Sequence, residues 1–207
     1  MYAPAHFAET RVPVLHEAMR RIGFATLVTA GAAGIEASHV PLLLDPEPAP
    51  YGTLLGHIAR DNPQWQGGAA DALAIFLGPD SYVSPAWYPS KKQHGRVVPT
   101  WNYVAIHAHG RADFFDDAAR LEALVTRLTA MHEAGRPEPW AVSDAPRDYL
   151  DTMLKAIVGF TLPIARLEGK WKMSQNRPPE DRAAVAAALR QAGESAVAAM
   201  VERPSDE

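Results

Sequence analysis

Short segments rich in β-branched and apolar residues, separated by glycine and proline turns, fill most of this chain before residue 116. The pattern predicts strands over 24–30, 35–44, 53–58, 73–77, 81–84, 100–110 and 112–115, and a later strand over 157–167. Hairpin connections of this kind suit neighbouring antiparallel strands, because a parallel crossover needs a long connection, usually a helix. We therefore predict an α+β, mainly β protein built on an antiparallel barrel.

Helical periodicity is concentrated near both ends of the chain and after the longest predicted strand. A first helix is predicted over 13–22, where Pro13 suits the first turn and Gly23 ends it. A second is predicted over 116–133, where apolar residues recur at helical spacing. Further helices are expected over 62–67, 147–154 and 178–199, the last with a break at Gly193.

Three segments are predicted to be irregular. Residues 31–34 are typical of a turn, and 45–52 is a loop with three prolines. Residues 85–96 form a polar excursion that is expected to be mobile.

Length and composition limit the class of protein. The 207 residues suit one domain with a helical extension from about residue 178. Cysteine is absent, which excludes disulfides and thiolate metal sites and is compatible with a cytoplasmic protein. The formal net charge of −4 gives no general attraction to nucleic acid. The sequence contains neither a signal-peptide pattern nor an apolar run long enough for a membrane helix.

Four polar-aromatic segments stand out from this ordinary background, and each places tryptophan beside amides, hydroxyls or cations. They cover 56–65, 81–88, 98–103 and 168–177. A plain core does not need this mixture, because buried polar groups must find partners. Aromatic faces, amides and cations together favour a flat, polar-edged, anionic ligand, and flavin mononucleotide (FMN) fits that description.

The same segments give the chain a family resemblance. Gly-His-x-Ala-Arg-x-Asn-Pro-Gln-Trp at 56–65, Val-Pro-Thr-Trp-Asn-Tyr at 98–103 and Lys-x-Ser-Gln-Asn at 172–176 resemble motifs of the PaiB-type family of FMN-binding negative transcriptional regulators. That family belongs to the FMN-binding split-barrel superfamily, with pyridoxamine phosphate oxidase and flavin reductases. The resemblance covers nearly the whole chain.

The resemblance implies a homodimer of six-stranded split barrels with FMN in each of two clefts at the subunit interface. It also implies negative regulation of genes for sporulation or degradative enzymes. Contact with DNA follows only from the resemblance, since the charge of the chain does not support it. The alternative is an FMN-dependent oxidoreductase that acts on a small molecule, in which the cofactor would carry the chemistry.

The segment with His57, Arg60 and Asn62 joins a predicted strand to a predicted helix that has Pro63 in its first turn. Helix starts favour phosphate, and Arg60 could add a charge-assisted contact. The resemblance implies that this corner holds the phosphate and ribityl chain of FMN. Alternatively, Asn62 only caps the helix and Arg60 is a solvated charge.

The other candidate cofactor residues lie on two later segments. Trp101 could cover the isoalloxazine ring and Asn102 could bond its pyrimidine edge, although Trp101 could equally be a dimer contact. If the second segment is extended, alternation places Lys170, Lys172 and Ser174 on one face, with Gln175 next to them. Two cations and a hydroxyl suit a phosphate or an anionic flavin edge, whereas a solvated basic strand end is the alternative.

No metal site and no catalytic residue are assigned from the sequence. His107 and His109 are two apart on one predicted strand and could bind a metal, but no third ligand is evident beside them. A dinucleotide-binding glycine motif, a P-loop and a nucleophile elbow are absent. Haem binding is a further alternative without an assignable motif.

Overall fold

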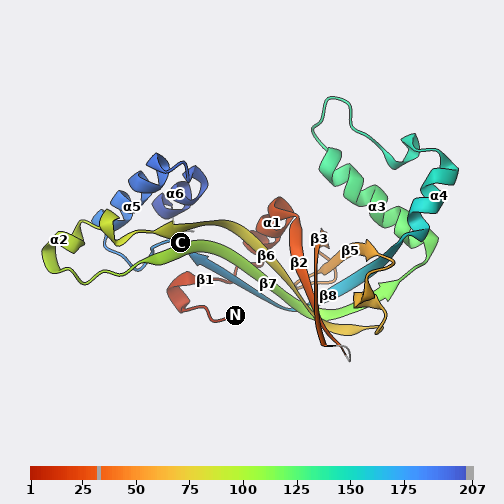
Figure 1. Ribbon diagram of the computed structural model, residues 1–207, viewed down its shortest axis with the longest axis horizontal. Helices are drawn as coiled ribbons and strands as arrows, with labels where there is room; N and C mark the ends of the chain where they lie inside the picture. Colours follow the sequence, from red (N-terminus) through yellow and green to blue (C-terminus); the bar gives the residue numbers. More distant parts are fainter. Residues whose placement is uncertain (32–33, 204–207) are drawn as a thin grey trace. The chain divides into compact units, whose positions relative to one another are not determined.

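The computed structural model describes residues 1–31 and 34–203. Their strands form one eight-stranded sheet in the order β3-β2-β6-β7-β8-β5-β4, with β1 paired to β8 (Figure 1). Six strands have seven residues or more: β2 Phe24–Gly31, β3 Gly34–Pro41, β5 Thr53–Ala59, β6 Ala70–Val83, β7 Thr100–Phe115 and β8 Ile157–Lys172. The other two are β1 Ala8–Glu9 and β4 Leu43–Asp45. The predicted mainly β, α+β class is confirmed.

The helices of the described residues lie between and after the strands. The α-helices are α1 Val12–Ile22, α2 Ser90–His94, α3 Ala118–Glu133, α4 Arg147–Lys155, α5 Pro179–Gln191 and α6 Ser195–Glu202. Single 3-10 turns are η1 Ala5–Phe7, η2 Pro63–Trp65, η3 Pro85–Trp87 and η4 Val142–Asp144. None of these helices combines the length and apolar character that crossing a membrane requires.

The chain divides into two compact units. The first contains Met1–Leu15, Leu77–Ile106 and Glu168–Glu207, and the second contains His16–Phe76 and His107–Leu167. The single domain predicted from the sequence stays a prediction.

The second unit holds the hairpin of β2 and β3 and the helices α3 and α4. The hairpin pairs antiparallel from Phe24 with Pro41 to Gly31 with Gly34. Strand β5 pairs antiparallel with both β4 and β8. Helix α3 packs on β4 through Leu124 and Leu128, which contact Leu43. Apolar alternation on the strands and the helical spacing on α3 thus meet in one core.

The first unit holds the N-terminal segment, the far part of β6 and β7, the end of β8 and the helices α5 and α6. Strand β1 pairs antiparallel with β8, with Ala8 opposite Lys170. Helices α5 and α6 pack on one another through buried apolar residues: Val185, Leu189, Val197 and Val201. The predicted break at Gly193 is confirmed, because this glycine has φ 86° between the two helices.

Several predicted boundaries are wrong for local physical reasons. The strand predicted over 35–44 is split into β3 and β4, because the N–H of buried Leu42 turns to donate to the Gly23 carbonyl at 2.8 Å. The strands predicted over 73–77 and 81–84 are one strand, β6. Its Pro79 lies beyond Ile75, where the pairing with β2 ends, so no bond of that pairing is lost.

Two further segments differ from expectation. The polar excursion at 85–96 contains η3 and α2, and Ser90 anchors it by donating from its N–H and hydroxyl to Asp181 at 3.1 and 2.7 Å. Strand β8 runs on to Lys172, five residues past the predicted end at Leu167. The predicted turn at 31–34 contains residues 32–33, which lie outside the described residues.

Candidate functional site

A small pocket in the first unit brings together segments about 70 residues apart in the sequence. Its volume is ≈ 90 Å³, and it is lined by Phe7, Thr100, Asn102, Lys172, Ser174, Asn176 and Arg177. We call it the Lys172 pocket. The start of β7, the end of β8 and the turn that follows β8 supply most of its wall, and η1 supplies Phe7. None of these lining residues is acidic, so the pocket carries an uncompensated positive charge.

Asn102 and Ser174 form the buried part of the pocket. Their side chains are only 1% and 4% exposed. The Asn102 amide donates to Ser174 Oγ at 3.0 Å, and Ser174 Oγ lies 3.3 Å from Asn102 Oδ1. Ser174 is also the non-glycine residue in the described chain with a positive φ, at 62°. Such a backbone persists only where its surroundings hold it, and it is often found at ligand sites.

Gln175 holds the turn rather than the pocket. Its Oε1 accepts a hydrogen bond from the Met173 N–H at 2.7 Å, and its Nε2 donates to the Trp171 carbonyl at 2.6 Å. Both ends of the amide are therefore used within the turn. Gln175 positions Ser174 and does not line the pocket.

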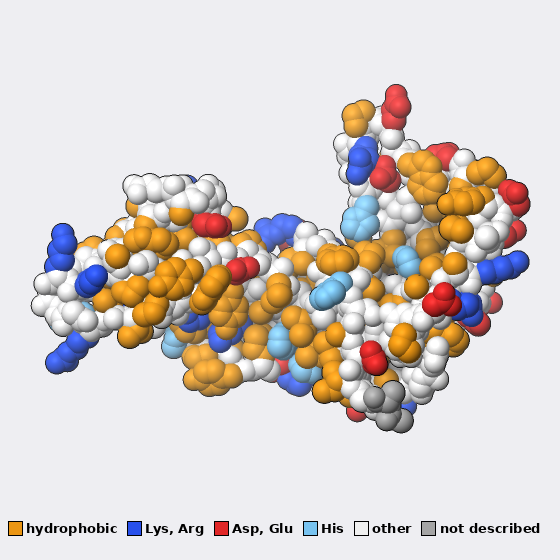
Figure 2. Space-filling view, in the orientation of Figure 1, with side chains coloured by type: hydrophobic (Ala, Val, Ile, Leu, Met, Phe, Trp, Pro, Cys, Tyr) orange, Lys and Arg blue, Asp and Glu red, His pale blue; other side chains and the backbone are white. Residues whose placement is uncertain are grey.

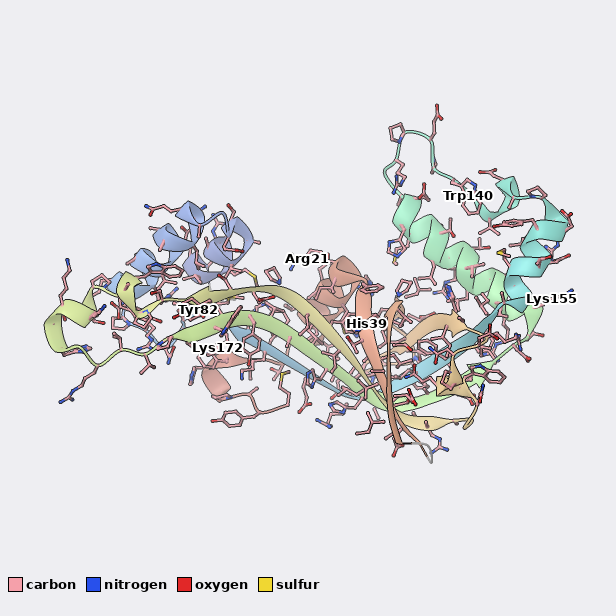
Figure 3. The ribbon with its side chains drawn as sticks, in the orientation of Figure 1. Arg21, His39, Tyr82, Trp140, Lys155 and Lys172 are labelled. Carbon is pink, nitrogen blue, oxygen red and sulfur yellow. The ribbon has the colours of Figure 1, made fainter. Side chains whose placement is uncertain are left out.

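Lys172 directs its ammonium group to the start of β7 (Figure 3). Its Nζ donates to Thr100 Oγ1 and to the Trp101 carbonyl, each at 2.5 Å. Two of three N–H groups are thus used, and one is left for a ligand. Burial lowers the pKa of Lys172, and the neighbouring charges of Lys170 and Arg177 lower it further. An anion in the pocket would relieve this repulsion.

Arg177 is the second cation of the pocket. Its guanidinium carbon lies 4.8 Å from the centre of the Tyr88 ring. Tyr88 is 2% exposed, and its hydroxyl has no hydrogen-bond partner among the described residues. Burial raises the pKa of Tyr88, so this hydroxyl stays neutral. The aromatic face holds Arg177 without neutralising its charge.

Lys170 lies outside the lining of the pocket. Its Nζ donates to the Tyr2 carbonyl at 3.1 Å and lies 5.2 Å from the centre of the Tyr103 ring. The residue is 8% exposed. Its charge is therefore already solvated by a carbonyl and by an aromatic ring, and it acts on the pocket through Lys172.

Trp101 lies beside the pocket and faces solvent. Its side chain is 54% exposed, and its ring packs edge-on against Tyr82 with 6.1 Å between the centroids. Trp101 contributes its carbonyl to Lys172, whereas its ring is free to cover a planar ligand or a protein partner.

The three residues predicted at the strand-to-helix corner lie in the second unit, where the side chains of two of them are hydrogen-bonded within the chain. Asn62 Oδ1 accepts from the Gln64 N–H at 2.9 Å, and its Nδ2 donates to Ser38 Oγ at 2.7 Å. Arg60 donates to the carbonyls of Lys155 and Ile157 at 2.6 and 3.2 Å. Asn62 thus caps η2, and Arg60 ties the end of β5 to the start of β8.

His57 faces a groove of ≈ 290 Å³ whose lining includes Leu128, His132 and Trp140. Its Nδ1 is buried without a hydrogen-bond partner among the described residues, and burial lowers its pKa. His57 is therefore a neutral ring in a groove that also contains the Glu133 carboxylate, which suits packing better than phosphate binding.

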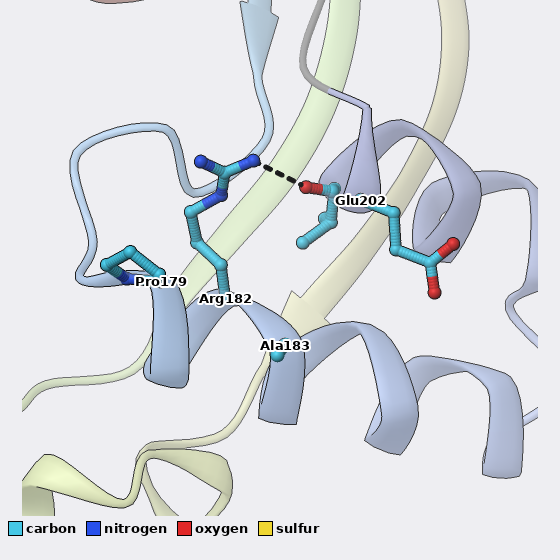
Figure 4. A pocket seen from close by; sticks show the side chains of 5 residues that line it. Pro179, Arg182, Ala183 and Glu202 are labelled. Atoms are coloured by element: carbon cyan, nitrogen blue, oxygen red, sulfur yellow. Dashed lines mark hydrogen bonds between the residues drawn. The ribbon is translucent and has the colours of Figure 1, made fainter.

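A larger pocket of ≈ 240 Å³ lies between α5 and α6 (Figure 4). Arg182 in its wall donates to the Val201 carbonyl at 3.3 Å. A cation at the last carbonyls of a helix caps it, so this pocket is explained by helix packing.

Four lining residues are outside the set predicted from the sequence: Phe7, Thr100, Asn176 and Arg177. Arg177 directly follows the Ser-Gln-Asn motif, which is a signal that could have included it. No sequence pattern points to Phe7, because η1 and the pairing of β1 with β8 bring it to the pocket.

Comparisons with known proteins agree with a flavin site. Residues 1–166 match the family described as "Putative FMN-binding domain". The protease synthase and sporulation protein PAI 2 of Bacillus subtilis is 33% identical, with 87% of this chain and 85% of the relative covered. An uncharacterized protein of Aspergillus fumigatus is 35% identical, with 89% of each chain covered.

Solved structures with the same fold are more distant in sequence. An FAD- and haem-binding protein of Mycobacterium smegmatis is 19% identical with a TM-score of 0.57. The match covers 86% of this chain and 79% of that protein's chain. A conserved hypothetical protein of Mycobacterium tuberculosis is 10% identical with a TM-score of 0.58. The match covers 86% of this chain and 94% of that protein's chain. These likenesses support the split-barrel fold.

The residues of the Lys172 pocket fit a flavin that ends in one phosphate, because two cations and two buried hydrogen-bonding side chains surround a space without a carboxylate. The chain belongs to the PaiB-type FMN-binding family, and its cofactor is the flavin FMN.

Proposed function

We propose that this protein holds the phosphate of FMN in the Lys172 pocket and acts as a flavin-dependent regulatory protein, in the form of a homodimer. The observation that carries the proposal is a small pocket with two cations and no acidic lining residue. Charge-assisted hydrogen bonds to phosphate are about twice as strong as neutral ones.

Each side chain has a distinct role in this proposal. The remaining N–H of Lys172 and the guanidinium of Arg177 bind phosphate oxygens, while Asn102 and Ser174 supply hydrogen bonds at the buried end. Trp101 covers one face of the ring system. Bound FMN supplies the capacity to accept and donate electrons, and the protein orients it and sets its access to solvent.

The regulatory role is supported by the PAI 2 relative, whose name describes protease synthesis and sporulation. A homodimer is supported by apolar side chains exposed on the first unit: Leu77, Tyr82, Val98 and Trp101. Figure 2 shows hydrophobic side chains gathered on the face of this unit that is turned to the viewer. The proposal does not include direct contact with DNA, because the net charge of −4 gives no general attraction to nucleic acid.

The second candidate function is an FMN-dependent oxidoreductase. The exposed Trp101 and Tyr82 favour it, since an open aromatic surface would let a small acceptor approach the flavin. Oxidation of NADH or NADPH much faster than by free FMN would favour this candidate. Oxidation of NADH or NADPH no faster than by free FMN would favour the regulatory function.

The phosphate assignment is tested by calorimetric titration with FMN and riboflavin. We expect Lys172→Gln and Arg177→Gln each to weaken FMN binding roughly tenfold or more, about 1.4 kcal/mol, and to leave riboflavin binding unchanged. Arg60→Gln is the matched control, because Arg60 is engaged with its own chain. A larger loss in Arg60→Gln than in Lys172→Gln would place the phosphate at the strand-to-helix corner instead.

A further inference from the structure

The Lys172 pocket has a closed end and an open end. Phe7, Asn102 and Ser174 at the closed end are 7%, 1% and 4% exposed. Asn176 is exposed, and Thr100 and Arg177 are half-buried, so they form the mouth. A ligand therefore enters from one side and meets a wall on the other.

Phe7 is a fixed part of this wall. In η1 its N–H donates to the Pro4 carbonyl at 2.8 Å, and the next residue, Ala8, is paired with Lys170 of β8. The centre of its ring lies 5.9 Å from Lys172 Nζ. The apolar ring offers no hydrogen bond, so it bounds the anion site without binding the anion.

The size of the pocket limits the anion that it can hold. Its volume is ≈ 90 Å³. That space suits a single phosphoryl group, whereas nucleotide-sized ligands occupy pockets of about 300 Å³ or more.

The position of the phosphate within the flavin then becomes decisive. A terminal phosphate monoester has one covalent link and three free oxygens, so it enters a closed pocket with its link at the mouth. The inner phosphate of FAD has two links, one to riboflavin and one to the adenylate, so it needs two exits. The closed pocket provides one.

We propose, building on the function proposed above, that Phe7 is a specificity-determining residue that restricts this site to a terminal phosphate monoester. The site thereby accepts FMN and rejects FAD. The two cations complement a dianionic monoester, and a phosphodiester carries only one charge for the same site.

The test measures calorimetric dissociation constants of FMN, FAD and riboflavin for the full-length protein. We expect the unmodified protein to bind FMN roughly a hundredfold more tightly than FAD, the ratio that the loss of two charge-assisted contacts would produce. Phe7→Ala opens the closed end and should reduce this ratio to about tenfold or less. Phe24→Ala is the matched control, since Phe24 is 57% exposed in the second unit, does not line the pocket, and should leave the ratio unchanged.

The outcomes separate the two proposals. Equal affinity of the unmodified protein for FMN and FAD, with Lys172→Gln still weakening FMN, overturns the role of Phe7 alone. FMN binding that is indifferent to Lys172→Gln and Arg177→Gln overturns the phosphate assignment. If the circular dichroism spectrum shows that Phe7→Ala is unfolded, Phe7→Leu replaces it in the test. An unchanged ratio of FMN affinity to FAD affinity in a folded Phe7 variant contradicts the inference.

Discussion

Lys172 is the residue that most affects the chemistry of the pocket. Two of its N–H groups are committed to Thr100 and Trp101, and the charges of Lys170 and Arg177 are near enough to lower its pKa. Without an anion the charged form is therefore less favoured than in an ordinary lysine. A bound dianion reverses this balance, so binding of FMN and protonation of Lys172 should reinforce one another.

The affinity for FMN should depend on pH in two opposite ways. It should rise through roughly pH 6, where the phosphate gains its second charge. It should fall as pH rises through the lowered pKa of Lys172, below the ordinary 10.5, because the free protein loses the proton that binding requires. Dissociation constants measured from pH 5 to 10 test both limbs.

Lys172→Arg is the control for the alkaline limb. Arginine stays charged throughout this range, so the fall at high pH should disappear while the acidic limb remains. The same alkaline limb in both proteins would show that another group titrates.

Lys172 also affects the pH dependence of folding stability, in the direction opposite to its effect on FMN binding. Its folded-state pKa lies below the unfolded value of 10.5. Between these two values the unfolded chain binds more protons, so this residue makes the protein more stable as pH rises. Binding of FMN and folding therefore respond oppositely to alkaline pH at this one residue.

At the scale of elements, the second unit depends on close approach of its strands. Gly110 on β7 has no room for a side chain, because a Cβ there would lie 2.2 Å from the Pro163 carbonyl oxygen. Gly159 on β8 is restricted in the same way by the Phe115 ring. These glycines let the neighbouring residues approach the backbone of the long strands closely, as expected where a strand bends.

Gly110→Ala should lower the free energy of unfolding by about 1–3 kcal/mol, because backbone must move to admit the methyl group. Urea unfolding followed by circular dichroism measures this change. Gly31→Ala on β2 is the matched control, since no atom lies within 4 Å of its added Cβ, and we expect a change within about 0.5 kcal/mol. Equal effects of the two substitutions would contradict the packing argument.

At the scale of the whole molecule, the proposed homodimer requires a surface that a second copy can cover. Tyr82 and Trp101 pack edge-on and are 45% and 54% exposed. Exposed aromatic groups of this kind often mark protein interfaces. The placement would also bring a second chain close to the residues beside the Lys172 pocket.

Tyr82→Glu should weaken self-association roughly tenfold or more, because it buries a charge in the proposed interface. Sedimentation velocity over a range of concentrations measures the dimer dissociation constant. Tyr149→Glu on α4 is the matched control, with the same substitution at a tyrosine that is 57% exposed in the second unit. Loss of the dimer in the control alone would move the interface to α4.

Features set by neighbouring residues could be predicted from the sequence. Pro13 and Gly23 bound α1 because proline fits a first turn and Gly23 adopts φ 64° at the end. Apolar spacing predicted α3, whose Leu121, Leu124 and Leu128 are buried. The alternative weighed for Asn62, that of a helix cap, is what the contacts around η2 show.

The sequence by itself thus determined the order and type of most elements and, through its motifs, the flavin-binding family, because these depend on short-range patterns. Tertiary structure decided which polar residues are available to a ligand. Arg60 and Lys172 both belong to conspicuous motifs, yet carbonyls distant in the chain engage Arg60, while Lys172 meets Arg177 and Phe7 at a pocket. The hydrogen-bonding groups that a side chain keeps available for a ligand depend on contacts between residues far apart in sequence. Local sequence patterns do not encode these contacts.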